Sequence, residues 1–171
     1  MEKPAIEEVQ EFFLKVSESG WASGSIKTTE NENLPGFKIL NFSQDSGELK
    51  FRDEYCVGAD GLSSGRTVVW FNDIPIWAKA FQGRYPEEFI APLKRALVSA
   101  FKDRSFIGGR GPEQFLDEES NSLYLNQVKG DFRKFRGIET IHPNWGDKGM
   151  PEVFETNPKA YHEYHGLWLL D

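Results

Sequence analysis

Short strand-like runs separated by tight turns are the feature that most constrains this chain. Residues 37–83 contain four runs rich in β-branched and aromatic residues, divided by turn residues such as Asp45-Ser46-Gly47. A parallel crossover needs a dozen or more residues, and these connections are shorter than that. Residues 37–83 are therefore predicted to form an antiparallel meander.

A second group of strand-like runs lies between residues 123 and 170. It consists of Leu123 to Val128, Gly137 to His142 and Tyr161 to Leu170. Each run has the length and residue types of a strand. We predict a second meander over residues 123–170.

Two segments have the apolar spacing of amphipathic helices. In residues 4–19, apolar side chains recur every three or four positions and Glu7 and Glu8 complement the positive helix start, with Gly20 as the predicted stop. In residues 86–102, Pro86 suits an early helical position and the apolar stripe runs through Leu93 and Leu97. We predict one α+β domain over residues 1–171, in which an N-terminal and a central helix pack on a bent sheet made by both meanders.

The two predicted meanders share an order of residue types. The order is an aromatic residue, Asp or Asn, Gly, a second Gly before a β-branched run, and finally aromatic-x-Gly. It is formed in the first meander by Phe51, Asp53, Gly58, Gly65 and Phe81-Gln82-Gly83, and in the second by Tyr124, Asn126, Gly130, Gly137 and Tyr164-His165-Gly166. An internal duplication explains this order, and chance similarity between meanders is the alternative. A duplication predicts pseudo-symmetric halves with a ligand groove between them.

Several short motifs also carry a family resemblance, over about residues 48–167. They are Phe51-Arg52-Asp53-x-Tyr55, Pro75-x-Trp77, Phe81-x-Gly83, Arg110-Gly111-Pro112, Gly130-Asp131-Phe132, Phe135-x-Gly137-x-Glu139 and Tyr164-His165-Gly166. As an ordered set they resemble an uncharacterised domain family of bacteria and archaea. The chain departs from that pattern at Thr67, where a second Gly-x-Glu is expected, and in the long insert between Ile141 and Tyr161. The resemblance implies a bacterial or archaeal origin and relatives fused behind a helix-turn-helix of the xenobiotic-response-element type, but no established activity.

Composition excludes several classes of protein. The 171 residues include 14 Phe, 5 Trp and 5 Tyr, which is too aromatic for a disordered chain. No apolar run reaches the length of a membrane span, the start lacks a secretory signal, and the single Cys56 cannot build a disulfide framework. With 20 basic and 27 acidic residues, the net charge of −7 disfavours nucleic-acid binding. We therefore expect a cytoplasmic protein without membrane contact.

The densest titratable set is His162-Glu163-Tyr164-His165. In a strand His162 and His165 point to opposite faces, whereas Glu163 and His165 share a face that Glu139 or His142 from the neighbouring strand could join. A carboxylate beside an imidazole suits proton transfer, so Glu139 and His165 are the candidate catalytic residues. The alternative is that His165 bonds a backbone carbonyl beside Gly166.

Asp53, Tyr55, Trp77 and Tyr85 are the corresponding set in the first half. A carboxylate among aromatic rings could orient an apolar ligand in a pocket, although such rings are more often core. The glycine-rich loop at Arg110, followed by Pro112-Glu113-Gln114-Phe115 as a short helix start, could hold an anion or be a plain turn. A basic cluster at residues 129–136 is interpreted as a solvated turn.

The sequence favours a non-catalytic domain that senses a small molecule or binds a protein partner, with a homodimer as one form of the latter. The predicted ligand-binding residues are Asp53, Tyr55, Trp77, Arg110, Glu139 and His165. The alternative is a small hydrolase or isomerase using Glu139 and His165. A nucleic-acid accessory domain is a third hypothesis, implied only by the family's fusions. No metal or cofactor is predicted.

Overall fold

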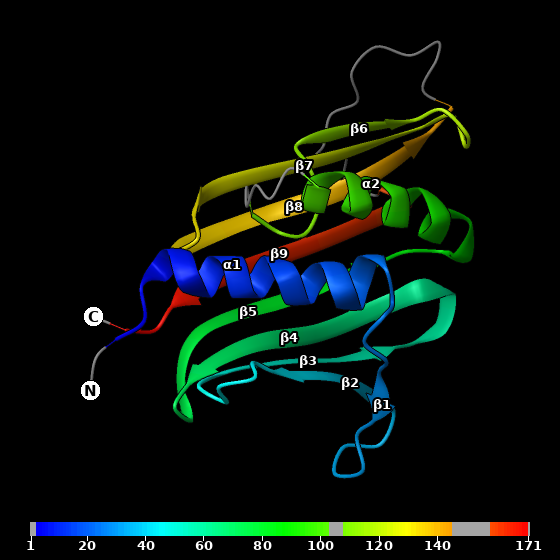
Figure 1. The fold of residues 1–171 in the computed structure, drawn as a ribbon. Coiled ribbons are helices and arrows are strands. Elements are labelled where there is room, and N and C mark those ends of the chain that lie inside the picture. The colour runs from blue at the N-terminus through cyan, green and yellow to red at the C-terminus, as the bar shows by residue number, and fades with distance from the viewer. Residues whose placement is uncertain (1–2, 103–107, 145–157, 171) are drawn as a thin grey trace.

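The computed structural model describes residues 3–102, 108–144 and 158–170. In this part of the chain, two α-helices lie against one sheet of nine strands (Figure 1). The strands are β1 (Thr29–Glu30), β2 (Phe37–Ser43), β3 (Leu49–Val57), β4 (Leu62–Phe71), β5 (Ile74–Arg84), β6 (Gln114–Asp117), β7 (Ser122–Asp131), β8 (Lys134–Pro143) and β9 (Ala160–Trp168). The predicted α+β class is confirmed.

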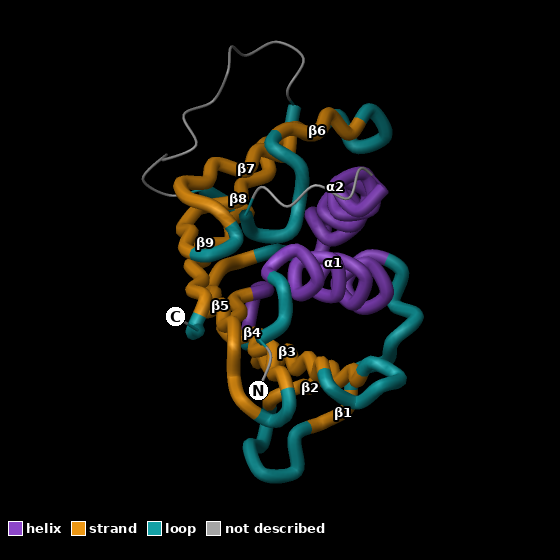
Figure 2. Tube along the Cα trace, turned by 60° about the vertical axis from the view of Figure 1, so that its left-hand side comes forward, coloured by secondary structure: helices purple, strands orange, loops and turns teal. Residues whose placement is uncertain are grey.

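The sheet consists of two meanders that meet at their last strands. The strand order is β1-β2-β3-β4-β5-β9-β8-β7-β6, and every neighbouring pair is antiparallel. Strands β2 to β5 form the first meander, β6 to β9 the second, and β5 pairs with β9. Seen from the side, the sheet bends around both helices (Figure 2), as the sequence predicts for merged meanders.

The helices differ from their predicted bounds at the ends. Helix α1 (Ile6–Ser17) is followed directly by a π-helical turn, Glu18–Ala22. The chain therefore stays helical past Gly20, the predicted stop. A 3₁₀ turn, Glu87–Phe89, precedes α2 (Ile90–Lys102), so the chain enters α2 four residues later than predicted from Pro86.

Two edge strands were not predicted. The stretch expected to begin a helix at Pro112 instead leads into β6, which pairs with β7. Strand β1 lies between the predicted N-terminal helix and the first predicted meander, where no strand is predicted. Edge strands this short are fixed by the partner strand rather than by their own residues. Sequence pattern alone therefore misses them.

The core lies between the helices and the bent sheet, around Trp77 of β5. The Trp77 ring stacks on Phe132 at 5.0 Å between centroids and contacts Phe13 of α1 at 4.8 Å. Its indole nitrogen donates a hydrogen bond to the Phe132 carbonyl oxygen at 2.9 Å. Trp77 thus joins α1 to both meanders. These are the contacts of a core residue, which is the alternative that the sequence left open for this ring.

The strand register repeats between the meanders. The matching cross-strand pairs are Asp53↔Thr67 with Asn126↔Glu139, and Gly65↔Phe81 with Gly137↔Tyr164. At the junction Phe81 pairs directly with Tyr164, so a pseudo-two-fold axis passes between them. A Cβ on either Gly65 or Gly137 would lie 2.4 Å from a carbonyl oxygen of the preceding strand. Equal register and equal steric restriction support an internal duplication.

Candidate functional site

Six polar side chains are buried at matched positions of the two meanders, on the sheet face that carries the helices. Lys79 lies two residues before Phe81, and His162 lies two residues before Tyr164. The six are between 0 and 3% exposed and are Asp53, Thr67 and Lys79 in the first meander, and Asn126, Glu139 and His162 in the second. We call these residues, with Tyr85, Arg110, Tyr124 and Tyr164 around them, the buried polar cluster.

Asp53 is held by two hydrogen-bond donors. The Thr67 hydroxyl donates to one carboxylate oxygen at 2.6 Å, and the Trp21 indole nitrogen donates to the other at 3.2 Å. Burial raises the pKa of Asp53, while Lys79 and the two hydrogen bonds oppose that effect. The π-helical turn after α1 thus supplies a lid over this carboxylate through Trp21.

Lys79 is buried without a hydrogen-bond partner among the described residues. Its Nζ lies 4.2 Å from the centroid of the Trp21 ring, 5.4 Å from that of Phe81 and 5.6 Å from that of Phe13. Burial lowers the pKa of Lys79 to about 7, although Asp53 acts in the opposite direction. This amine therefore loses its proton far more readily than an exposed lysine does, and its environment is largely aromatic.

Glu139 is the best-satisfied carboxylate of the cluster. One oxygen accepts the Arg110 backbone N–H at 2.9 Å, and the other accepts Arg110 Nη2 and the Tyr85 hydroxyl at 3.2 and 3.3 Å. The Arg110 side chain is 15% exposed, so it connects the cluster with the surface. A buried ion pair of this kind depends on both partners being present.

His162 packs between rings on the second-meander side. Its ring centroid lies 4.9 Å from that of Phe81 and 6.1 Å from that of Tyr85. Burial, followed by the charges of Arg110 and Lys79, lowers the pKa of His162 well below its ordinary value. The imidazole is therefore neutral near pH 7.

Four buried polar atoms of the cluster have no hydrogen-bond partner among the described residues. They are Lys79 Nζ, Arg110 Nε, the Tyr124 hydroxyl and His162 Nδ1. Buried polar atoms are nearly always paired in native proteins, so a group of unpaired ones needs an explanation. Water or a bound molecule with complementary groups would supply the missing partners.

The structure brings some predicted site residues together and separates others. Asp53, Arg110 and Glu139 lie in the cluster, and Tyr55 is half-buried on the same strand face as Asp53. His165 does not join them. Glu139 is paired in register with His162, and His165, three residues further along β9, points to the opposite face. The predicted approach of Glu139 and His165 is therefore wrong, and the hydrolase or isomerase hypothesis loses the residue pair on which it rests.

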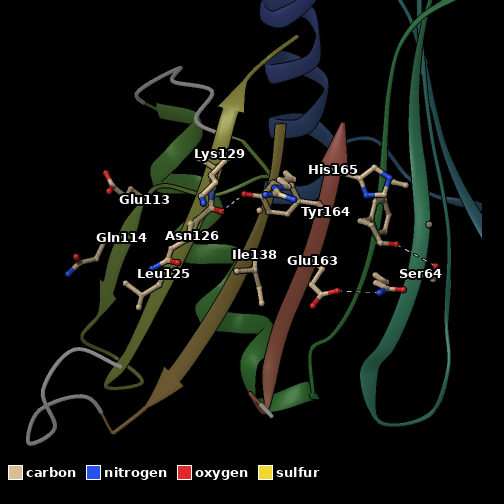
Figure 3. A pocket seen from close by; sticks show the side chains of 18 residues that line it. Ser64, Glu113, Gln114, Leu125, Asn126, Lys129, Ile138, Glu163, Tyr164 and His165 are labelled. Carbon is tan, nitrogen blue, oxygen red and sulfur yellow. Dashed lines mark hydrogen bonds between the residues drawn. The ribbon is translucent and has the colours of Figure 1, made fainter. Parts of the chain in front are cut away.

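The opposite face of the same strands carries an open groove of about 1350 Å³ (Figure 3). Its apolar floor includes Leu125 and Ile138, and its polar side chains include His165 and Glu163, the latter accepting a hydrogen bond from Gln82 at 3.2 Å. These two side chains are exposed to solvent, whereas those of the buried polar cluster are shielded from water. Because strongly perturbed groups mark functional sites, we take the cluster as the candidate site.

Sequence reasoning missed Lys79, His162 and Trp21. The alternation Trp77-x-Lys79-x-Phe81 already places a lysine between two aromatic residues on one strand face, which is a signal that could have been used. His162 could have been found by applying the repeat to Lys79. Trp21 carried no signal, because its contact with the sheet depends on the π-helical turn.

Other predicted surface features have plain structures. In the hairpin at residues 129–136, Asp131 accepts the backbone N–H groups of Arg133 and Lys134, and the basic side chains are exposed, as in a solvated turn. Within the described ranges, the acidic, histidine and cysteine side chains form no group of three that could hold a metal ion. None of the helices described is long and apolar enough to cross a membrane.

Comparison with known proteins gives a family without an assigned activity. A family model described as "Domain of unknown function (DUF5680)" matches residues 53–151, which is more than half of the chain. The matched range contains Asp53, Lys79, Arg110 and Glu139. No curated protein and no solved structure matches the chain. The resemblance to an uncharacterised family is confirmed, while the microbial origin and the helix-turn-helix fusions stay predictions.

Proposed function

The chain belongs to the DUF5680 family of domains of unknown function, and we propose that this member is a small-molecule-binding domain whose site is the buried polar cluster. Binding without chemistry is the simplest role for it, because the one acid-base pair that the sequence suggested does not assemble. A sensing domain needs only a selective site and a fold that the ligand stabilises.

The observation that carries the proposal is the unpaired amine of Lys79. Lys79 is 2% exposed, and its Nζ has no hydrogen-bond partner among the described residues. Taking an ammonium group out of water costs several kcal/mol unless a partner compensates. The nearby Asp53 carboxylate is already held by Thr67 and Trp21. A ligand with an acceptor group would give Lys79 Nζ the hydrogen-bond partner that it lacks among the described residues.

The arrangement of the second meander is consistent with ligand entry at residues 108–111. Arg110 reaches from this loop into the cluster and is partly exposed, whereas Lys79, Glu139 and His162 are enclosed. A molecule that reached the cluster past Arg110 would encounter Tyr85 first, since the guanidinium carbon lies 5.7 Å from the centroid of that ring.

The test is a thermal-shift screen of the whole chain against metabolites of neutral, cationic and anionic classes. A ligand that binds only the folded state raises the melting temperature, and the stabilisation grows with the logarithm of the ligand concentration relative to Kd. We expect at least one compound to raise the melting temperature of the wild type but not that of Lys79→Met. The matched control is Lys50→Met, which removes a β3 lysine whose side chain is 41% exposed and is paired with Asp73 of the β4–β5 turn, and it should respond as wild type. A library that stabilises nothing, or stabilises Lys79→Met equally, overturns the proposal.

A further inference from the structure

The unpaired atoms of the buried polar cluster share one chemical character. Lys79 Nζ, Arg110 Nε and the Tyr124 hydroxyl are hydrogen-bond donors, and His162 Nδ1 is a donor or an acceptor according to its tautomer. A complementary molecule must therefore bring acceptor atoms. Two of the donors belong to cationic side chains, which favour an acceptor with negative charge.

The two carboxylates of the buried polar cluster already accept hydrogen bonds from other residues. Asp53 accepts hydrogen bonds from Thr67 and Trp21, and Glu139 accepts three from Arg110 and Tyr85. Arg110 therefore offers its unpaired Nε–H, and Lys79 offers its whole amine. The protein supplies more free donors than free acceptors at this place.

The unpaired donors lie around one group of aromatic rings. Lys79 Nζ and the His162 ring lie 5.4 and 4.9 Å from the centroid of Phe81. His162 and Arg110 lie 6.1 and 5.7 Å from that of Tyr85. The His162 ring joins those of Phe81 and Tyr85 between Lys79 and Arg110, and these rings would suit a flat or apolar ligand body.

We propose that the ligand is a small monocarboxylic acid, bound as the anion, whose carboxylate accepts hydrogen bonds from Lys79 Nζ and Arg110 Nε and whose apolar body lies against the rings of Phe81 and Tyr85. This inference rests on the proposed function and names its ligand class. A carboxylate has two acceptor oxygens for the two cationic donors. A phosphate dianion shares the chemistry but loses more hydration on burial in an aromatic site.

The direct test is calorimetric titration of the whole chain with matched acid and amide pairs of increasing size, such as acetate with acetamide and benzoate with benzamide. Benzamidine and inorganic phosphate complete the set. At least one acid should bind tenfold or more tightly than its amide, and Lys79→Met should lose tenfold or more of that affinity. Two control variants should bind as wild type. They are Lys50→Met, which replaces a lysine whose side chain is 41% exposed, and His165→Ala, which changes the groove of the opposite face.

Proton uptake gives a second measurement that needs no variant. The charged or titratable groups facing Lys79 are Asp53, Arg110, Glu139 and His162. A bound carboxylate raises the pKa of Lys79, so binding at pH 8 should take up close to one proton and binding at pH 6 almost none. Titrations in buffers of different ionisation enthalpy measure this number.

The outcomes separate the two proposals. Binding of amides, benzamidine or phosphate in place of the acids overturns the inference and leaves the small-molecule site standing. Acids that bind equally to wild type and Lys79→Met, or without proton uptake at pH 8, also overturn it. If neither these probes nor the metabolite library binds, the proposed function itself fails, and the unpaired donors are satisfied by water alone.

Discussion

Replacing Lys79 by methionine should make the ligand-free protein more stable and remove a specific pH dependence. Burial lowers the pKa of Lys79 from 10.5 to about 7. The difference of about 3.5 corresponds to about 5 kcal/mol, because one pKa unit is worth about 1.36 kcal/mol. Methionine fills a similar volume without this cost, but it also removes a cation near Asp53. We therefore expect a net gain of about 1–4 kcal/mol at pH 7.

The pH dependence has a definite sign. Below pH 7 both the folded and the unfolded chain hold the Lys79 proton, and between pH 7 and 10.5 only the unfolded chain does. Unfolding therefore takes up a proton in this window, and the free energy of unfolding rises with pH. From pH 7.5 to 9 the gain should be about 2 kcal/mol. Burial raises the pKa values of Tyr85 and Tyr124 well above 10.0, so these hydroxyls titrate outside the window.

The assay is urea denaturation of the wild type, Lys79→Met and Lys50→Met at pH 7.5 and 9. Lys50→Met removes an exposed ion pair with Asp73 and should keep both the wild-type stability, within about 0.5 kcal/mol, and the wild-type rise with pH. Lys79→Met should lose the rise. A Lys79→Met protein that is less stable than wild type and keeps the same pH dependence would show that Lys79 is not a strained buried amine.

Further predictions concern the second meander. Glu139→Gln leaves a buried guanidinium without its carboxylate and should lower the free energy of unfolding by about 3 kcal/mol, whereas Glu163→Gln on the opposite face should change it by less than about 0.5 kcal/mol in the same denaturation assay. Gly109→Ala adds a Cβ at 2.6 Å from the Tyr164 ring and should cost at least about 2 kcal/mol more than Gly47→Ala. Both glycines have positive φ, but Gly47 has nothing within 4 Å, so equal losses would refute the close packing of this loop.

Most of the fold could be predicted from local pattern. Short turns force antiparallel neighbours, and three-to-four-residue apolar spacing marks both helices, so the meanders and helices follow from the chain itself. The edge strands β1 and β6 could not be found in this way, since partner strands determine them. The ends of α1 and α2 shift by one short turn of π or 3₁₀ helix, which the tertiary packing selects.

The candidate site shows a sharper limit of sequence reasoning. Asp53, Arg110 and Glu139 were singled out one at a time, each from its local surroundings, and the structure brings them together. The pairing of Glu139 with His165 failed because strand alternation fixes faces within one strand only. The relative phase of β8 and β9 depends on register, and the connection between them is too long for turn geometry to set it.

The repeated register of the two meanders allows their buried carboxylates to be compared position by position. Within the buried polar cluster each half holds one carboxylate, and each of these two receives a donor from the segment that follows the preceding helix, Trp21 after α1 and Arg110 after α2. In the second half that donor is charged, so the positive charge of Arg110 compensates the carboxylate of Glu139. In the first half Trp21 is neutral and caps Asp53 without a charge, while its ring stands over Lys79. Lys79 thus has no hydrogen-bonded counter-ion among the described residues, and a ligand anion would pair with it as Arg110 pairs with Glu139.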